Sequence, residues 1–277
     1  MSQVEWLRIL MRCKTNVQKQ ISPLLETRNQ PQLDLGIGAG GDPIKQIDIA
    51  AENAIINTLK QSGIAFTLVS EESGIRRFGE NPDLCYITVD PIDGTTNLLR
   101  GIPFYATSLA VSNKSTLNGV HTALVSDLYH NITYTAQKGK GAYRGDQKIN
   151  PSKNASLEEA VIGVDVNTYK IRKIAPKLTN LIEKTKHIRH LGANALELCY
   201  VADGTIDAFV DIRGKLRVTD MAAAWLILQE AGAKMTTLAG KNLNVKLDPK
   251  QRVAFVAANP EIHEIIINLV KFKREKI

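Results

Sequence analysis

The stretch that decides the fold runs from Leu84 to Asn97 and reads LCYITVDPIDGTTN. Its apolar run, which ends at Val89, predicts a buried strand that leads directly into two carboxylates. Asp90 and Asp93 are three residues apart, and the proline between them fixes a bend, so both can face one ion cluster. The carbonyl of Ile92 can add another oxygen ligand. Oxygen-only ligands favour magnesium, calcium or manganese over zinc or copper.

Glycine and hydroxyl residues follow these carboxylates at Gly94, Thr95 and Thr96. If these residues open a helix, its first N–H groups and the hydroxyls can bind an anion at the positive end of the helix dipole. Metal ions and a phosphate would then share one corner of the fold. The same string also fits a simple tight turn, because Asp-Pro and Asp-Gly are common turn formers.

Three more carboxylates stand where strands or helices begin or end. Glu71 follows the apolar run 66–69, and Asp220 precedes an apolar helix. Asp48 lies in the first turn of a helix that is expected to start at Asp42 and the proline after it. Strand ends that carry carboxylates are frequent places for binding sites. The structural alternative is a solvated loop for Glu71, a helix cap for Asp220 and a contact with the helix dipole for Asp48.

The pattern of apolar runs differs between the two halves of the chain. The first half predicts helices packed against a largely antiparallel sheet, whereas the second alternates strands and helices, as an α/β lobe does. We expect lobe 1–150 to carry most metal ligands and lobe 151–277 to carry Asp220 and the substrate-selecting residues. The first expected helix starts at about residue 7 and ends near Pro23 or soon after, and further helices are expected at 43–55, 171–185, 193–202, 221–230 and 260–270. The expected strands cover 66–69, 84–89, 105–111, 120–125, 132–136, 142–143, 161–164, the surroundings of 188, 206–210 and 253–257.

Composition narrows the class of protein. No apolar run approaches the ~18 residues that a membrane helix needs, and the N-terminus lacks the apolar core of a secretion signal, so we expect a cytoplasmic protein without a membrane partner. The three cysteines form no C-x-x-C pair, which disfavours a disulfide framework. A formal net charge of +7 favours anionic ligands. Only the C-terminal KFKREK is densely basic, so we expect small phosphorylated molecules rather than nucleic acid.

Three segments together resemble the inositol monophosphatase family. They are the pair Glu71-Glu72, the run 90–95 (DPIDGT) and the run 215–224 (KLRVTDMAAA), with further similarity at 41–48, 139–143 and 192–200. The resemblance spans nearly the whole chain and is strongest to the archaeal-type fructose-1,6-bisphosphatase/inositol-1-monophosphatase branch. It implies a layered α-β-α-β-α sandwich of the sugar phosphatase fold, of mixed α+β and α/β class, and a homodimer.

The resemblance also implies roles for single residues. Two or three magnesium ions, with manganese as a possible substitute, would bind oxygen ligands at Glu71, Asp90, the Ile92 carbonyl, Asp93 and Asp220. Gly94 and Thr95 would bind phosphate through backbone N–H groups. Glu71 and the Thr95 hydroxyl would orient the attacking water, with Asp48 as a further carboxylate beside Thr95. The loop around Asp42 resembles a mobile flap over the most weakly held ion. Direct attack by metal-activated water needs no covalent intermediate.

The substrate is predicted from cations that lie near Asp220 in the sequence. In inositol-specific relatives a glutamate occupies the place of Arg213, and a guanidinium there could instead pair with the second phosphate of a bisphosphate. We therefore expect hydrolysis of fructose 1,6-bisphosphate and also of inositol 1-phosphate. The other candidate substrate cations are Arg189, Lys215 and Arg217, for which a solvated basic face is the alternative.

Two other functions stay open on the sequence alone. A phosphatase for 3′-phosphoadenosine nucleotides or NADP would share the metal motifs. A catalytically silent module that binds inositol phosphates would share the fold. Glu197 and Tyr200 receive no predicted role, and a structural role is expected for His190.

Overall fold

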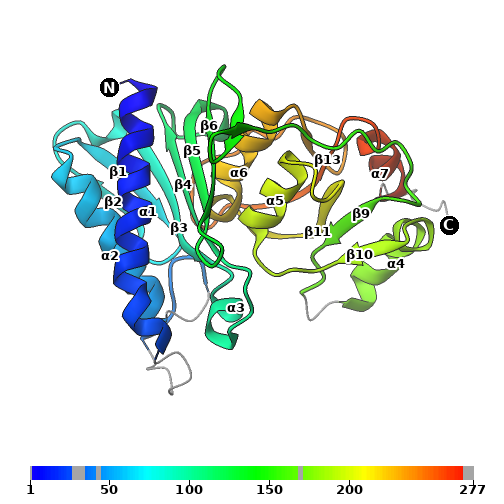
Figure 1. Ribbon diagram of the computed structural model, residues 1–277, viewed down its shortest axis with the longest axis horizontal. Helices are drawn as coiled ribbons and strands as arrows, with labels where there is room; N and C mark the ends of the chain where they lie inside the picture. Colours follow the sequence, from blue (N-terminus) through cyan, green and yellow to red (C-terminus); the bar gives the residue numbers. More distant parts are fainter. Residues whose placement is uncertain (1, 27–34, 42–44, 168–170, 271–277) are drawn as a thin grey trace.

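A computed structural model describes residues 2–26, 35–41, 45–167 and 171–270. Within these ranges the strands form an eight-stranded sheet and a five-stranded sheet (Figure 1). Helices α1 and α2 cover the outer face of the first sheet, α5 and α6 lie between the two sheets, and α4 and α7 cover the outer face of the second. The predicted α-β-α-β-α layering is therefore confirmed. The division into lobes 1–150 and 151–277 stays a prediction.

The first sheet has the strand order β2-β1-β3-β4-β5-β6-β7-β8. Its neighbours pair antiparallel, except that β1 and β3 run parallel, with Ser70 opposite Val89. The carboxyl ends of β1 and β3 therefore meet at one edge of the sheet. The strands are β1 (Phe66–Ser70), β2 (Gly74–Phe78), β3 (Tyr86–Asp93), β4 (Ala106–Ser112), β5 (Val120–Asp127), β6 (Ile132–Gln137), β7 (Ala142–Arg144) and β8 (Gln147–Lys148).

The second sheet has the order β10-β9-β11-β13-β12. Strand β11 is longer than predicted, because it continues beyond Val210 through a register shift between Asp211 and Leu216. That extension carries the chain directly into α6. The strands are β9 (Val161–Val164), β10 (His187–Arg189), β11 (Ala208–Arg217), β12 (Lys234–Thr237) and β13 (Arg252–Ala258).

Helix α1 ends at Glu26, soon after Pro23 as expected, but other helix boundaries differ from the predictions. Helix α2 begins at Gln46 with Lys45 as its N-cap rather than at residue 43, and it continues to Gln61. Helix α6 begins three residues earlier than expected, at Val218, and α7 three residues later, at His263. The expected cap and flap residue Asp42 lies outside the described residues. The helices are α1 (Gln3–Glu26), α2 (Gln46–Gln61), α3 (Thr95–Arg100), α4 (Ile171–Lys184), α5 (Asn194–Ala202), α6 (Val218–Ala231) and α7 (His263–Val270).

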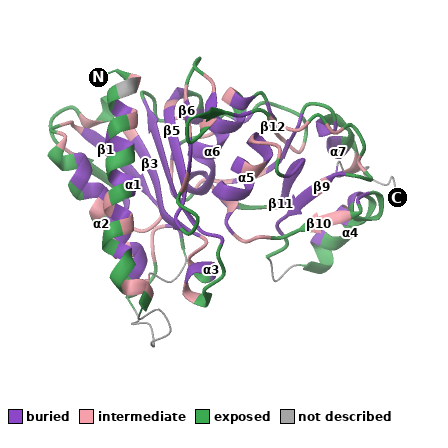
Figure 2. Cartoon of the chain, viewed as in Figure 1, coloured by how far each residue is buried: buried purple, intermediate pink, exposed green. Residues whose placement is uncertain are grey.

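Helix α6 is the most deeply buried of these helices (Figure 2). All residues from Val218 to Leu228 are buried, because the helix packs against the inner faces of both sheets. An apolar surface on every side is what such a position requires. Its C-terminus ends at Gly232, whose φ of +94° is the left-handed conformation that glycine adopts most readily. The helix thus fixes Asp220, in its first turn, against the first sheet.

Described residues include no helix with the length and apolar composition needed to cross a membrane. The cysteines Cys13, Cys85 and Cys199 are free thiols, and Cys13 and Cys199 are buried.

The position of α6 predicts a large effect of truncating its core side chains. Leu228 is 0% exposed, so Leu228→Ala should lower the free energy of unfolding by about 2–5 kcal/mol in urea denaturation. Leu84 is 77% exposed, and Leu84→Ala should change it by no more than about 0.5 kcal/mol. Equal effects of the two variants would contradict the buried position of α6.

Candidate metal and phosphate site

Three carboxylates converge at the edge where β1 and β3 end. Glu71 directly follows β1, Asp90 lies in β3, and Asp220 lies in the first turn of α6. One carboxylate oxygen from each lies within 4.8 Å of the others. Parallel pairing of β1 with β3 places Glu71 beside Asp90, and the buried helix brings in Asp220 from a segment 130 residues further along the chain than Asp90. The structure therefore gathers three of the predicted ligand residues.

Electrostatics at this cluster favours a bound cation. Burial raises the pKa of Asp90 well above its usual value, and the negative charges of Glu71 and Asp220 raise it further. Burial also raises the pKa values of Glu71 and Asp220. Oδ1 of Asp90 is buried and has no hydrogen-bond partner among the described residues. An all-oxygen donor set with an unsatisfied buried oxygen fits a hard divalent cation such as Mg²⁺.

Asp93 lies beside this cluster but its oxygens face α5. It accepts N–H groups from Asn194 at 3.0 Å and Ala195 at 2.7 Å, so its charge meets the positive end of the helix dipole. Burial raises the pKa of Asp93 to about 8, and the negative charge of Asp220 adds to this shift. The N–H groups of α5 act in the other direction and lower the pKa. A bound ion could share these oxygens. The metal-binding roles of Asp93 and of the Ile92 carbonyl stay predictions.

The glycine and threonine after Asp93 form the opening of α3. The Thr95 hydroxyl lies 3.0 Å from an Asp48 carboxylate oxygen and 2.9 Å from the carbonyl oxygen of Ile92. Burial raises the pKa of Asp48 to about 7, although the Thr95 contact opposes the shift. Gly94 has a φ of +87°, and a Cβ there would lie 2.9 Å from the Cβ of Ala193. Only glycine fits this close approach without strain.

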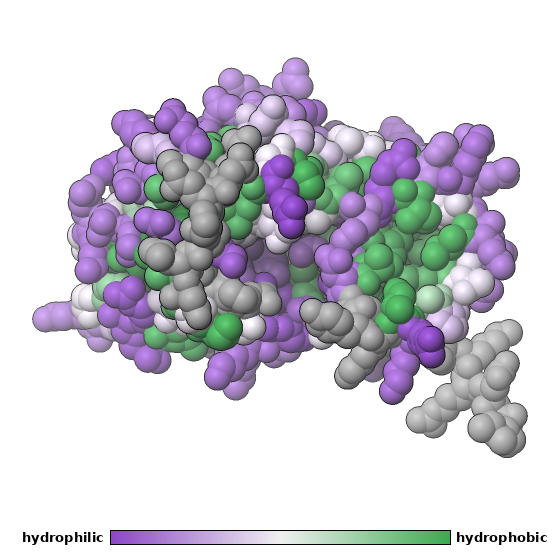
Figure 3. Space-filling view, turned by 90° about the horizontal axis from the view of Figure 1, so that it is seen from below, coloured by the Kyte–Doolittle hydropathy of each residue, from purple (hydrophilic) through white to green (hydrophobic). Residues whose placement is uncertain are grey.

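A cavity of about 830 Å³ opens over these residues. Figure 3 shows the molecule hollowed near the middle of the face seen from below, with hydrophilic residues in the recess. The carboxylates, Gly94 and Thr95 line the cavity. Its lining also includes Asn167, His190, Leu191, Gly192 and Asn194. Periodic sequence patterns could not assign roles to these five residues, because most of them lie between regular elements.

Arg217 is the predicted substrate cation that lines the cavity. Its guanidinium lies 2.6 Å from Glu71 and 3.4 Å from Asp220, so it is an ion-pair partner of the carboxylate cluster. Gly40 packs over this pair, since a Cβ at Gly40 would lie 2.9 Å from Arg217 Nη1. The segment is held there because the Gly40 N–H donates to the Glu71 carbonyl oxygen and the Ala39 N–H donates to the Glu72 carbonyl oxygen. Lys45, which the sequence analysis did not single out for substrate binding, also lines the cavity.

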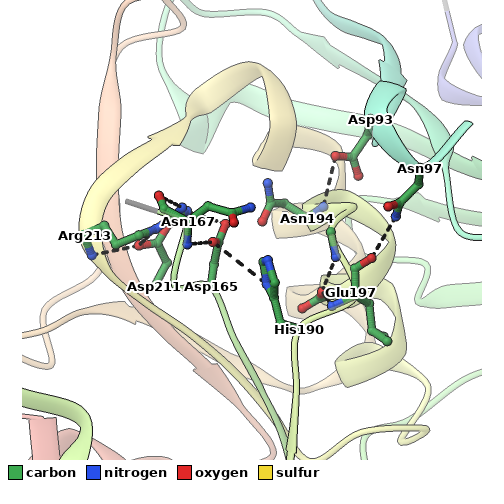
Figure 4. A network of polar contacts seen from close by, with 11 residues as sticks. Asp93, Asn97, Asp165, Asn167, His190, Asn194, Glu197, Asp211 and Arg213 are labelled. Carbon is green, nitrogen blue, oxygen red and sulfur yellow. Dashed lines mark hydrogen bonds and ion pairs between the residues drawn. The ribbon is translucent and has the colours of Figure 1, made fainter. Parts of the chain in front are cut away.

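The other predicted substrate cations lie away from the cavity lining. Arg213 is enclosed by carboxylates: its guanidinium pairs with Asp165 and, at 2.7 Å, with Asp211, and it donates to the Asn167 carbonyl oxygen at 2.8 Å (Figure 4). Its side chain is 6% exposed. The guanidinium of Arg189 donates to the Ile188 carbonyl oxygen. The substrate roles of these cations, Lys215 included, stay predictions.

Known proteins resemble the chain over nearly its whole length. It is 35% identical over 276 residues to the fructose-1,6-bisphosphatase/inositol-1-monophosphatase of Methanothermobacter thermautotrophicus, with 96% of each chain covered. It is 31% identical over 286 residues to the bifunctional NADP phosphatase/NAD kinase of Methanococcus maripaludis, covering 96% of this chain and 49% of that protein. A crystal structure described as an inositol monophosphatase-fructose 1,6 bisphosphatase superposes with a TM-score of 0.82 at 30% identity, with 95% of this chain and 99% of that chain covered.

The shared fold and the carboxylate cluster define a class, the metal-dependent phosphatases. Within that class the chain belongs to the inositol monophosphatase family, whose model matches residues 6–275. The family resemblance expected from the sequence motifs is confirmed.

The repulsion within the cluster predicts that removing one charge stabilises the metal-free protein. Asp90→Asn should raise the free energy of unfolding by about 0.5–2 kcal/mol in EDTA at pH 8. Because the folded-state pKa of Asp90 is raised, the wild type loses stability as pH rises above the ordinary carboxyl range, so the advantage of the variant should shrink toward pH 4. Urea denaturation across this pH range measures it.

A second buried aspartate provides the control. Oδ1 of Asp127 accepts the N–H groups of Tyr129 and His130, and Oδ2 lies 2.8 Å from Nδ1 of His130. Asp127→Asn removes the charge and the Oδ2 acceptor, so it should destabilise the protein at pH 8. Saturating Mg²⁺ should stabilise the wild type more than Asp90→Asn, since only the folded cluster binds the ion tightly. Destabilisation by Asp90→Asn in EDTA would contradict the assigned repulsion.

Proposed function

We propose that the protein is a Mg²⁺-dependent phosphatase that hydrolyses fructose 1,6-bisphosphate and inositol 1-phosphate. One observation carries the proposal: the convergent carboxylates Glu71, Asp90 and Asp220 share a polar cavity with the Gly94-Thr95 turn. Carboxylate oxygens that would hold metal ions, next to the backbone N–H groups of Gly94 and Thr95, suit a phosphoryl group. Names of relatives that combine both phosphatase activities support the choice of substrates.

Each residue of the site has a defined task in this proposal. Glu71, Asp90, Asp93, Asp220 and the Ile92 carbonyl hold two or three ions, for which Mn²⁺ can substitute. The bound ions lower the pKa of a water molecule and neutralise phosphate charge. The N–H groups of Gly94 and Thr95 bind phosphate oxygens.

The Thr95 hydroxyl orients the attacking water. It donates a hydrogen bond to Asp48 and keeps its lone pairs available to accept one from the water. Glu71 accepts a second hydrogen bond from this water. Asp48 can take up a proton near neutral pH, because burial raises its pKa to about 7.

A second candidate function is hydrolytic removal of a phosphate group from NADP. Relatives named bifunctional NADP phosphatase/NAD kinase match the chain over 96% of its length. Such a phosphatase would use the same metal site and differ in the cavity wall.

We also propose a cytoplasmic homodimer that binds neither nucleic acid nor membranes; the free cysteines favour a reducing compartment.

Phosphate release across four substrates tests the proposed reaction. With Mg²⁺, fructose 1,6-bisphosphate and inositol 1-phosphate should be hydrolysed, and EDTA should abolish the reaction. Asp93→Asn should lower kcat/KM by roughly 100-fold or more. Mutating a residue that only hydrogen-bonds to a metal ligand lowers activity by about 10- to 100-fold, and losing the ligand itself should lower activity further. Turnover confined to NADP or to 3′-phosphoadenosine 5′-phosphate would replace the substrate and keep the metal chemistry. Absence of turnover on all four would favour a silent binding module.

The cations of the cavity give a separate prediction about substrate choice. Lys45 lines the cavity, whereas Arg213 is enclosed by Asp165 and Asp211. Lys45→Gln should therefore raise KM for fructose 1,6-bisphosphate about tenfold and leave KM for inositol 1-phosphate nearly unchanged. Arg213→Gln tests the role expected from the sequence in the same assay. A larger selective effect of Arg213→Gln would assign the second phosphate to Arg213 instead.

A further inference from the structure

The carboxyl group of Glu197 is deeply buried and has no task in the proposed reaction. The residue lies in α5 and is 1% exposed. Its Oε1 accepts the N–H groups of Leu191 at 2.6 Å and Gly192 at 3.0 Å (Figure 4). Both donors belong to the turn that lines the cavity. Glu197 thus holds a turn that packs beside Gly94 and forms part of the cavity wall.

Other contacts show that this turn has a fixed conformation. Asn97 donates to the Leu191 carbonyl oxygen at 2.8 Å, and Asp93 accepts the N–H of Asn194. Gly192 has a φ of +88°, and a Cβ there would lie 3.2 Å from the amide nitrogen of Asn97. The turn is therefore tied to α3, to β3 and, through Glu197, to α5. Loss of any one tie would free part of the wall.

The second oxygen of Glu197 indicates which protonation state fits. Oε2 is buried and has no hydrogen-bond partner among the described residues. A Cβ on Gly163 would lie 2.9 Å from it, so glycine at this position leaves the oxygen its space. A carboxylate would leave a charged oxygen without a donor, which is costly in a buried site. A neutral carboxyl group keeps Oε1 as the acceptor and carries its proton on Oε2.

The charged groups around Glu197 include some that raise its pKa and some that lower it. Burial is the main cause that raises the pKa of Glu197 to about 7, and the negative charge of Asp165 adds to it, whereas Arg213 and the two N–H donors oppose it. Asp165 is itself paired with Arg213 and lies 4.0 Å from His190, which lines the cavity. Asp211 completes the group through its ion pair with Arg213.

We propose that Glu197 is a positioning residue whose neutral carboxyl group holds the 190–192 wall of the cavity, so that ionisation of Glu197 loosens the wall and weakens substrate binding. That the protonated Glu197 holds the 190–192 wall is a property of the protein without substrate. The predicted effect on substrate binding rests on the proposed phosphatase function.

The sign of the linkage follows from the direction of the shift. The folded state binds the Glu197 proton more tightly than the unfolded state, in which the pKa has its ordinary value of 4.5. The contribution of Glu197 to the free energy of unfolding should therefore fall as pH rises from about 4.5 to about 7 and stay level above that range. Glu197→Gln keeps the acceptor and cannot ionise, so the variant lacks this contribution, whereas the contributions of Asp90 and Asp93 are present in both proteins.

The test compares Glu197→Gln with Glu230→Gln by urea denaturation in EDTA between pH 5 and 8.5. Glu230 is a matched control because it also accepts two backbone N–H groups of a turn, those of Gly139 and Gly141, but lies outside the cavity. Relative to wild type, the unfolding equilibrium constant of Glu197→Gln should fall by at least about tenfold between pH 5 and pH 8. Glu230→Gln should show no such change. A pH-independent difference for Glu197→Gln would overturn the proposal.

Two further measurements keep the proposal falsifiable. If Glu197→Gln does not fold, the ¹³Cδ shift of Glu197 in the wild type reports its titration directly. A midpoint near 7 supports the proposal, and one below 5 overturns it. In the active enzyme, KM for the accepted phosphate ester should rise several-fold from pH 6 to pH 8.5 in the wild type and in Glu230→Gln but not in Glu197→Gln. Because the denaturation and NMR measurements need no substrate, they stand even if the phosphatase assay fails.

Discussion

Mutual repulsion among Glu71, Asp90 and Asp220 is the constraint on which the rest of the structure depends. Like charges held together out of water are unfavourable unless a cation joins them. The protein keeps them together because each is attached to a rigid element that is stabilised elsewhere: two paired strands and a helix buried between two sheets. Stability of the layers thus maintains an arrangement that is unfavourable without a cation.

The same layers explain how the 190–192 wall of the cavity is placed. Helix α5 packs beside α6 between the sheets, and the N–H groups at its N-terminus donate to Asp93. Glu197, two residues further along the helix than Ala195, holds the turn that forms this wall. Asp93, beside the carboxylate cluster, and the 190–192 turn are therefore connected through the short helix α5. A change in the position of either is expected to shift the other.

Sequence reasoning located the carboxylates because each stands at the end of an apolar pattern, as Asp90 does after Val89 and Asp220 does before Met221. Periodicity also predicted most of the helices and strands, since these patterns are local, whereas the layered arrangement was expected from the family resemblance. Sequence reasoning could not place Arg213, because a guanidinium near Asp220 in sequence can face either the cavity or the buried carboxylates Asp165 and Asp211, and only the bend in β11 decides which.

Nor could sequence reasoning assign a task to Glu197. A carboxylate inside an apolar helix carries no local sign of whether it is paired, ionised or neutral, because its partners are backbone groups of a preceding loop.

The most direct test of the central claim is diffraction from crystals soaked in Mn²⁺, with data collected at the manganese absorption edge. The account predicts an anomalous peak between the carboxylates of Glu71, Asp90 and Asp220, within bonding distance of oxygens from all three. An empty cluster at saturating Mn²⁺, with the peak elsewhere or absent, would contradict it.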